Sequence, residues 1–400
     1  MRTTSATYRS TWTGRRFKRT ISDARTISYL LCGAAITLLP LGRALADSDD
    51  KGGRFIPSII VSSTVPANGD LNPYCVAFVP PEFPQGGLLK PGDLLVSNFN
   101  NSKNQQGTGT TIIKLTLNGT GSVAPSGSAT VFFQGPAPLG LTTALGVLKR
   151  GFVLVGNLPT NAGVLIPGQP GSLLIIDKNA QVKTTLSDMV LLDGPWDLTI
   201  HDEGDRAQVF VSNVLNGTVT RIDLVIPVGG KPVVTSMIQI ASGYGFRHDP
   251  TALVVGPTGL AYDAKKDVLY VASTDDNTIF KVLQAGSTSQ SVVKGAIVFR
   301  NNNLRGPLGL VLAPNGDLIT SNGDAVNADP SHPSEIVEFT KNGKFVAQFN
   351  VDAGQGGAFG IGLDSPGHNK VHFAAVDDNA NDISVHTLSV GEKGGEESQD

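Results

Sequence analysis

A polar residue recurs at the end of a short apolar segment in each of six sequence units. The six residues are Asn98, Asn157, Asn213, Ser273, Asn322 and Asp377. Oxygen ligands of this kind suit Ca²⁺ or Mg²⁺ better than zinc. In a closed ring of units, the four asparagines could bind a cation or a polyol around one mouth of a central channel. Asparagine also bonds turn backbone well, so strand capping is the alternative, and repetition along the chain favours it.

A second set of chemically capable residues lies at or before the first strand of several units: Asn72, Asp193, Trp196, Asp197, His248, Asp249 and Arg305. Some of these could point into the channel, although Trp196 and Asp197 cannot both do so, because side chains alternate along a strand. His248 beside Asp249 is the candidate catalytic pair, since a histidine facing the channel could act as a general base. A surface turn before Pro250 is the alternative that we favour.

These residues are positioned by a repeated pattern of short strands and turns. The clearest copy spans residues 256–282, with strands expected at 259–262, 268–272 and 278–282 between Asp- and Asn-rich turns. Further copies begin near Asn72, Gly140, Gly194, Gly306 and Phe359. Six units of about four strands, roughly fifty to seventy residues apart, predict an all-β, six-bladed β-propeller.

The two ends of the repeat region predict how the ring closes. Residues 55–65 form a β-rich segment before the first unit, and the last unit has three clear strands. We therefore expect 55–65 to supply the outer strand of the last blade, which removes two sheet edges at once. Long polar insertions at 100–110, 159–171 and 324–334 follow second strands, so they should share one face of the ring, where binding tends to be built.

The segments outside the repeat indicate an exported protein. Residues 1–46 have a basic start, an apolar run at 27–41 and a small-residue cleavage site, which are typical of a signal peptide. The Arg15-Arg16-Phe17 sequence is a hint of twin-arginine export. The apolar run is too short and broken for a membrane span. We expect a linker at 47–53, the propeller at 54–390, a disordered acidic tail at 391–400, and a periplasmic or secreted location without stable membrane insertion.

Removal of the signal peptide makes the chain acidic. The full chain has 31 basic and 34 acidic residues, of which residues 1–46 hold eight and one, so the mature chain has 31 − 8 = 23 and 34 − 1 = 33, a net charge of −10. This balance argues against nucleic acid as a partner. Cys75 is the one cysteine outside the signal peptide, and its apolar strand predicts a buried, inert thiol.

The pattern Gly-Pro-x-Gly-Leu-Ala-x-Asp, then Leu-Tyr-Val-Ala, then Asn-Thr-Ile in residues 256–282 resembles NHL-repeat and SMP-30/gluconolactonase-like six-bladed propellers. Residues 194–222 and 306–339 match next best. For the lactonase members, the resemblance implies a metal on a Glu near the first inner strand, two Asn and an Asp. Asn213 with Asp275, or Asn322 with Asp324, could stand in for parts of that set, with Ca²⁺ or Mg²⁺ as the cofactor. Asp70 and Asn72 occupy the place of the Glu.

The preferred functional hypothesis is a non-catalytic binding or scaffold protein of the NHL type that acts through its loop-bearing face. Its partner would be a protein, a glycan or a small molecule. The alternative is a divalent-metal-dependent lactonase or hydrolase with its site at the channel mouth. The sequence contains no Gly-x-Ser-x-Gly, His-Glu-x-x-His, phosphate-loop or Cys-x-x-Cys motif.

Overall fold

A computed structural model describes residues 58–117, 129–137, 139–323, 325–367 and 370–389. The predicted signal peptide 1–46, linker 47–53 and tail 391–400 lie outside the described residues. The part of the chain that is described contains no helix with the length and hydropathy of a transmembrane span.

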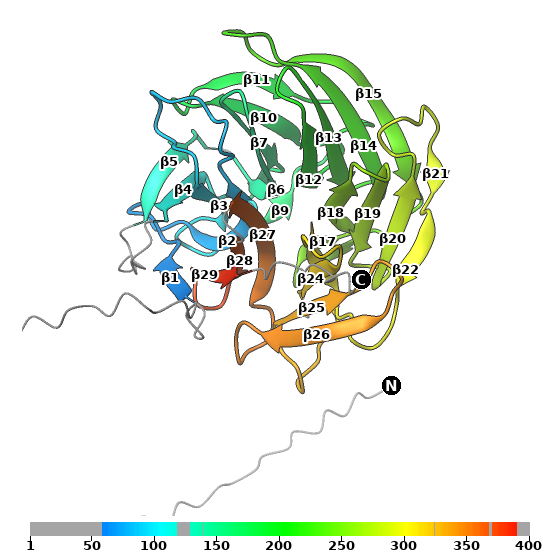
Figure 1. Ribbon diagram of the computed structural model, residues 1–400. Coiled ribbons are helices and arrows are strands. Elements are labelled where there is room, and N and C mark those ends of the chain that lie inside the picture. The colour runs from blue at the N-terminus through cyan, green and yellow to red at the C-terminus, as the bar shows by residue number, and fades with distance from the viewer. Residues whose placement is uncertain (1–57, 118–128, 138, 324, 368–369, 390–400) are drawn as a thin grey trace, which may run out of the picture. The chain divides into compact units, whose positions relative to one another are not determined.

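The described strands form six blades, each of four antiparallel strands, around a common centre, which confirms the predicted all-β six-bladed propeller (Figure 1). The first three blades consist of β2 (Leu71–Phe78), β3 (Asp93–Asn100), β4 (Thr111–Thr116) and β5 (Thr130–Gln134); β6 (Leu141–Leu148), β7 (Phe152–Asn157), β10 (Ser172–Asp177) and β11 (Val182–Leu186); and β12 (Pro195–Asp202), β13 (Arg206–Asn213), β14 (Thr218–Val225) and β15 (Val233–Ser242), extended by β21 (Val292–Val293).

The other three blades complete the ring. They consist of β18 (Pro257–Asp263), β19 (Val268–Ser273), β20 (Thr278–Leu283) and β22 (Ala296–Phe299); β23 (Pro307–Leu312), β24 (Leu318–Asn322), β25 (Glu335–Phe339) and β26 (Phe345–Asn350); and β27 (Ala358–Gly367), β28 (Lys370–Asp377), β29 (Asp382–Ser389) and β1 (Ser58–Ser63). Two short hairpins lie in the connections: β8 (Thr160–Asn161) with β9 (Val164–Leu165), and β16 (Arg247–Asp249) with β17 (Leu253–Val255).

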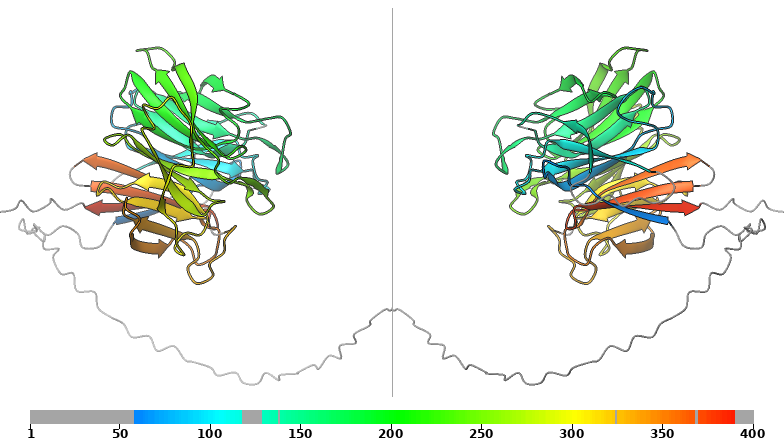
Figure 2. Two further views of the ribbon diagram at one scale, coloured as in Figure 1. Left: turned by 90° about the vertical axis from the view of Figure 1, so that its right-hand side faces the viewer. Right: turned by 90° about the vertical axis from the view of Figure 1, so that its left-hand side faces the viewer.

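The last blade closes as predicted, with the N-terminal strand at its outer edge. β1 pairs antiparallel with β29, and Ile60 lies opposite Val385. Figures 1 and 2 both show the blue β1 beside the red strands of this blade. This pairing joins the two ends of the described propeller in one sheet, so strand hydrogen bonds hold the ring closed.

The hydrophobic core is divided among the interfaces between neighbouring blades. Each second strand is largely buried on both faces; every residue of β7 and of β19 is buried. One cluster, for example, packs Leu95 and Ile112 of the first blade against Val153 and Val155 of the second. Burial of each such side chain stabilises the fold by about 1.5–3 kcal/mol. The inner strands β2, β6, β12, β18, β23 and β27 contact one another in ring order and surround the channel.

Candidate functional site: the loop-bearing face and the central channel

The four asparagines at the ends of second strands are buried in the connections that lead into their own blades. The Nδ2 of Asn98 donates to the Thr64 carbonyl oxygen over 3.0 Å. The Oδ1 of Asn157 accepts from the Gly140 backbone N–H over 2.9 Å. Both partners precede the inner strand of the same blade. These amides therefore hold the incoming connection against the end of the second strand.

Asn213 and Asn322 make the same kind of contact. The Nδ2 of Asn213 donates to the Leu191 carbonyl oxygen over 3.1 Å. The Asn322 amide accepts from the Arg305 N–H over 2.9 Å and donates to the Asn303 carbonyl oxygen over 2.7 Å. These contacts are of the kind expected if the repeated asparagines cap the strands. Among the described residues, however, no group donates to Oδ1 of Asn98 or Asn213.

Three of the four residues that could stand in for a lactonase metal set lie in the described part of the chain, where they make the following contacts. Oδ1 of Asn322 accepts from the Arg305 N–H, whereas Asn213 is held through its Nδ2. Asp275 forms an ion pair with Arg247. Asp324 lies outside the described residues. The described residues also contain no group of three or more His, Cys, Asp or Glu side chains placed to hold a metal.

The candidate catalytic pair lies in the β16–β17 hairpin. The side chain of His248 is exposed to solvent. Asp249 is buried and accepts hydrogen bonds from the backbone N–H groups of Thr251 (2.9 Å) and Ala252 (3.0 Å). Burial alone would raise the pKa of Asp249, but these bonds and Arg247 outweigh burial and lower it. The described contacts of Asp249 thus stabilise the turn at 249–252, which contains Pro250.

The same hairpin helps to close the channel at the loop-bearing face. Leu253 and Val254 belong to one buried cluster with Tyr74, Phe99, Trp196 and Phe359, which we call the aromatic cluster. The ring centroids of Tyr74 and Phe359 are 4.5 Å apart, and those of Tyr74 and Trp196 are 5.6 Å apart. Trp196 is only 1% exposed. These packed rings fill the channel where the inner strands begin.

Below the aromatic cluster, a bulge in each inner strand determines which residues face the channel. In every blade, the pairing of the inner strand with the second strand shifts register near the start of the inner strand. Examples are the shifts between Pro195 and Asp197 and between Pro307 and Leu310. Ser212 fixes this region: its Oγ accepts from the Asp197 N–H over 3.1 Å and donates to the Thr258 carbonyl oxygen of the next blade over 2.8 Å. The bulge and this bond hold Asp197 at the channel.

At the position that Asp197 occupies in the third blade, the last three blades have a glycine: Gly259, Gly309 and Gly360. A Cβ at Gly259 would lie 2.2 Å from the Leu308 carbonyl oxygen, and one at Gly360 would lie 2.2 Å from the Tyr74 carbonyl oxygen. Neither glycine could be replaced without moving a neighbouring inner strand. The side chains at this level of the channel therefore come from the first three blades.

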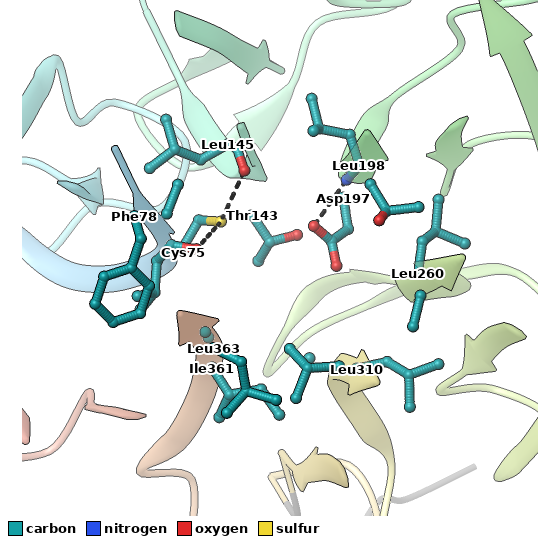
Figure 3. A pocket seen from close by; sticks show the side chains of 18 of the residues that line it. Cys75, Phe78, Thr143, Leu145, Asp197, Leu198, Leu260, Leu310, Ile361 and Leu363 are labelled. Atoms are coloured by element: carbon teal, nitrogen blue, oxygen red, sulfur yellow. Dashed lines mark hydrogen bonds between the residues drawn. The ribbon is translucent and has the colours of Figure 1, made fainter. Parts of the chain in front are cut away.

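A cavity of about 310 Å³ occupies the channel below this level. At its deep end lie Cys75, Thr143 and Asp197, one from each of the first three blades (Figure 3). The Thr143 hydroxyl donates to the Trp196 carbonyl oxygen, which places Thr143 next to Asp197. The Asp197 carboxyl accepts from the Leu198 N–H over 2.7 Å. These three residues, which we call the deep-end group, place polar side chains at one end of a cavity whose other lining side chains are mostly apolar.

Burial governs the protonation of the deep-end group. Asp197 borders the cavity but is surrounded by protein, and this burial raises the pKa of its carboxyl well above the usual value, against the lowering effect of the Leu198 and Leu260 N–H groups. Burial, and then the charge of Asp197, raise the pKa of the Cys75 thiol. The structure confirms that Cys75 is buried and unpaired.

Sequence reasoning named Asp197 but missed Cys75 and Thr143 as its neighbours. A usable signal was present, because Cys75, Asp197, Gly259 and Gly309 each lie two residues after a proline at the start of a first strand. In the second unit this proline is absent, since Leu141 begins the strand. The register shift between the inner and second strands is also longer there, from Leu141 to Leu145. Thr143 could therefore be assigned to the channel only from the structure.

No known protein family and no curated protein matches the sequence. Similar solved structures include a gluconolactonase from Xanthomonas campestris, at 12% identity and a TM-score of 0.48, covering 81% of this chain and 88% of that chain. The calcium-binding protein regucalcin from Agrobacterium tumefaciens matches at 14% identity and a TM-score of 0.47, covering 82% and 94%. A chain of a nidogen/laminin complex matches at 11% and 0.40, covering 70% and 80%. The structural neighbours are thus SMP-30/gluconolactonase-like and NHL-like propellers of low sequence identity.

Proposed function

We propose that this protein is a non-catalytic binding protein of the NHL-type propeller architecture, and that it binds a protein partner through its loop-bearing face. The observation that carries this proposal is that connections from different blades are hydrogen bonded to one another on that face. Gln106 Nε2 donates to the Thr251 carbonyl oxygen over 2.9 Å, and the Thr160 N–H donates to the Gly107 carbonyl oxygen over 3.0 Å. A surface held in this way loses little conformational entropy on binding.

Exposed apolar side chains on connections of this face support a protein partner. Val164, Met189 and Val190 are 61–62% exposed, and Phe246 is 48% exposed. Val164 follows the second strand of its blade, and the other three precede the inner strands β12 and β18. Methionine and aromatic side chains are enriched in the central parts of protein interfaces.

No specific observation favours the metal-dependent lactonase alternative. That alternative needs several oxygen ligands from different blades near one point in the channel. Among the described residues that line the channel cavity, Asp197 is the single carboxylate, and a backbone N–H already donates to it. The residues described here therefore do not fit a divalent cation at this position.

The test compares substitutions on the two faces of the propeller. Met189→Asp and Phe246→Asp place charge on the loop-bearing face. Val228→Asp is the matched control, because Val228 is 90% exposed in the turn between β14 and β15, at the opposite end of the blade. The partner is captured by crosslinking in cells that produce the chain and identified by mass spectrometry, and the purified pair is then measured by titration calorimetry.

We expect Met189→Asp and Phe246→Asp to weaken the purified complex at least tenfold and Val228→Asp to leave it unchanged. The proposal fails if no partner is crosslinked above the background of an unrelated propeller, or if only Val228→Asp weakens the complex. It also fails if the purified chain hydrolyses lactones or esters with Ca²⁺ or Mg²⁺ at a rate that a chelator abolishes.

A further inference from the structure

We propose that the channel cavity binds a small uncharged molecule with an apolar body and a hydrogen-bonding head group, which enters from the face opposite the loops and contacts Asp197 at the deep end. This site is separate from the loop-bearing face. Its existence rests on the cavity, on its closure at one end and on the placement of one polar group there.

The cavity is closed at its end near the loop-bearing face. At its opposite end, the lining residues are less buried. Just beyond the deep-end group, Tyr74 and Trp196 are 5% and 1% exposed within the aromatic cluster. The far end is lined by Phe78, Leu312 and Leu363 near the ends of their inner strands, where each side chain is partly exposed. A molecule that reaches Asp197 therefore enters from this end, past these side chains and Tyr262, which is also partly exposed.

Most side chains that line the cavity are apolar, although polar atoms supply more of its exposed surface than apolar atoms do. Leu145, Leu198, Leu260, Leu310 and Ile361 come from five different inner strands and surround the space below the deep-end group (Figure 3). Ligand sites in proteins are commonly concave, mainly apolar and supplied with a few placed polar groups. A volume of about 310 Å³ suits a molecule of small size.

The deep end favours an uncharged head group. Burial raises the pKa of Asp197, so its carboxyl holds a proton to a higher pH than usual and can donate a hydrogen bond. Its side-chain oxygen also accepts from Leu198, and no Lys, Arg or His is among the described residues that line the cavity. The other titratable groups there are Tyr74, Cys75 and Tyr262. A carboxylate head group would meet no positive charge, whereas an amide or hydroxyl would find a partner.

The test uses three probes that share one apolar body: hexanamide, 1-hexanol and hexanoate. Binding to the purified mature chain at pH 7 is measured by ligand-observed NMR, with Cys75 modification by methyl methanethiosulfonate as the second readout. We expect hexanamide and 1-hexanol to bind in the millimolar range or tighter, to slow modification of Cys75, and to bind at least tenfold more tightly than hexanoate. Absence of binding by both neutral probes, or equal binding of hexanoate, overturns the proposal.

Three variants locate the bound molecule. Asp197→Leu should weaken hexanamide binding at least tenfold, whereas Asp197→Asn keeps a hydrogen-bond donor of the same size and should retain it. Leu363→Trp should slow or abolish binding by obstructing the far end, and Val164→Trp on the loop-bearing face should not. Unchanged binding in Asp197→Leu or Leu363→Trp, with folding verified by circular dichroism, refutes the assigned position; if Asp197→Leu does not fold, loss of binding in Asp197→Asn refutes the assigned role.

Discussion

Asp378 provides a sharp test of how burial controls charge near the channel. It follows β28, and its carboxylate accepts a hydrogen bond from Asn72 Nδ2 over 3.0 Å. Burial, and then the nearby charge of Asp377, raise the pKa of Asp378 to about 7 from a usual value of 3.8. The substitution Asp378→Asn removes the titrating group and keeps an oxygen that can accept from Asn72.

The direction of the change in stability follows from the pH at which Asp378 loses its proton in the unfolded and in the folded chain. The unfolded chain releases the proton of Asp378 near pH 3.8, whereas the folded chain keeps it to about pH 7. The folded state therefore loses stability as the pH rises through this range. A shift of 7 − 3.8 = 3.2 corresponds to a penalty of about 1 kcal/mol at pH 4.5 and about 4 kcal/mol at pH 8. Because Asp378 retains some contact with solvent, we expect about 2–3 kcal/mol of difference between the two pH values.

The assay is urea unfolding of residues 47–400, with and without Asp378→Asn, at pH 4.5 and pH 8. The buried Trp196 provides the fluorescence signal. The stability of the variant relative to the natural chain should increase by about 2–3 kcal/mol from the lower to the higher pH. Equal differences at both pH values would refute the assignment of a raised pKa to Asp378.

Asp188→Asn is the control with the opposite sign. The N–H groups of Leu191 and Val190 lower the pKa of Asp188. Its carboxylate therefore favours folding above the usual pKa of 3.8, and this contribution is lost only below that value, so its replacement should reduce stability at pH 8 more than at about pH 3. A variant series in which both substitutions shift stability in the same direction with pH would indicate a general effect of net charge instead.

Three further predictions concern other parts of the propeller. Asp197→Asn should also gain stability relative to the natural chain as pH rises, because burial raises the pKa of Asp197; an effect independent of pH in chemical unfolding would contradict this. Asn322→Ala should lose about 2–3 kcal/mol, because the Arg305 N–H and the Asn303 carbonyl oxygen lose their partner; a loss below about 0.5 kcal/mol would show that water replaces the amide without cost. Deletion of residues 47–63 should abolish cooperative thermal unfolding in calorimetry, because β29 loses its outer partner; an unchanged transition would show that closure by β1 is dispensable.

Much of the fold could be predicted because it depends on local patterns repeated along the chain. The segment 268–272 is apolar throughout and lies between polar turns, and it forms β19 as expected. The N-terminal segment 55–65 lacked a partner in its own unit, so pairing with the last blade was the way to remove two exposed edges, and β1 occupies that place. The described asparagine contacts match one of the two roles that the sequence left open.

The sequence by itself determined the blade pattern, the ring closure and the faces on which the long connections lie, because strand propensity, turn residues and unpaired edges act over short segments. The tertiary structure alone decided that Cys75, Thr143 and Asp197 meet at one end of a cavity. Their meeting depends on a bulge in each inner strand and on neighbouring strands packed closely at Gly259 and Gly360. Residues from successive blades, far apart in sequence, become neighbours only when the ring is complete, so the prolines that mark equivalent positions of Cys75 and Asp197 could not by themselves reveal the cavity or the place of Thr143 in it.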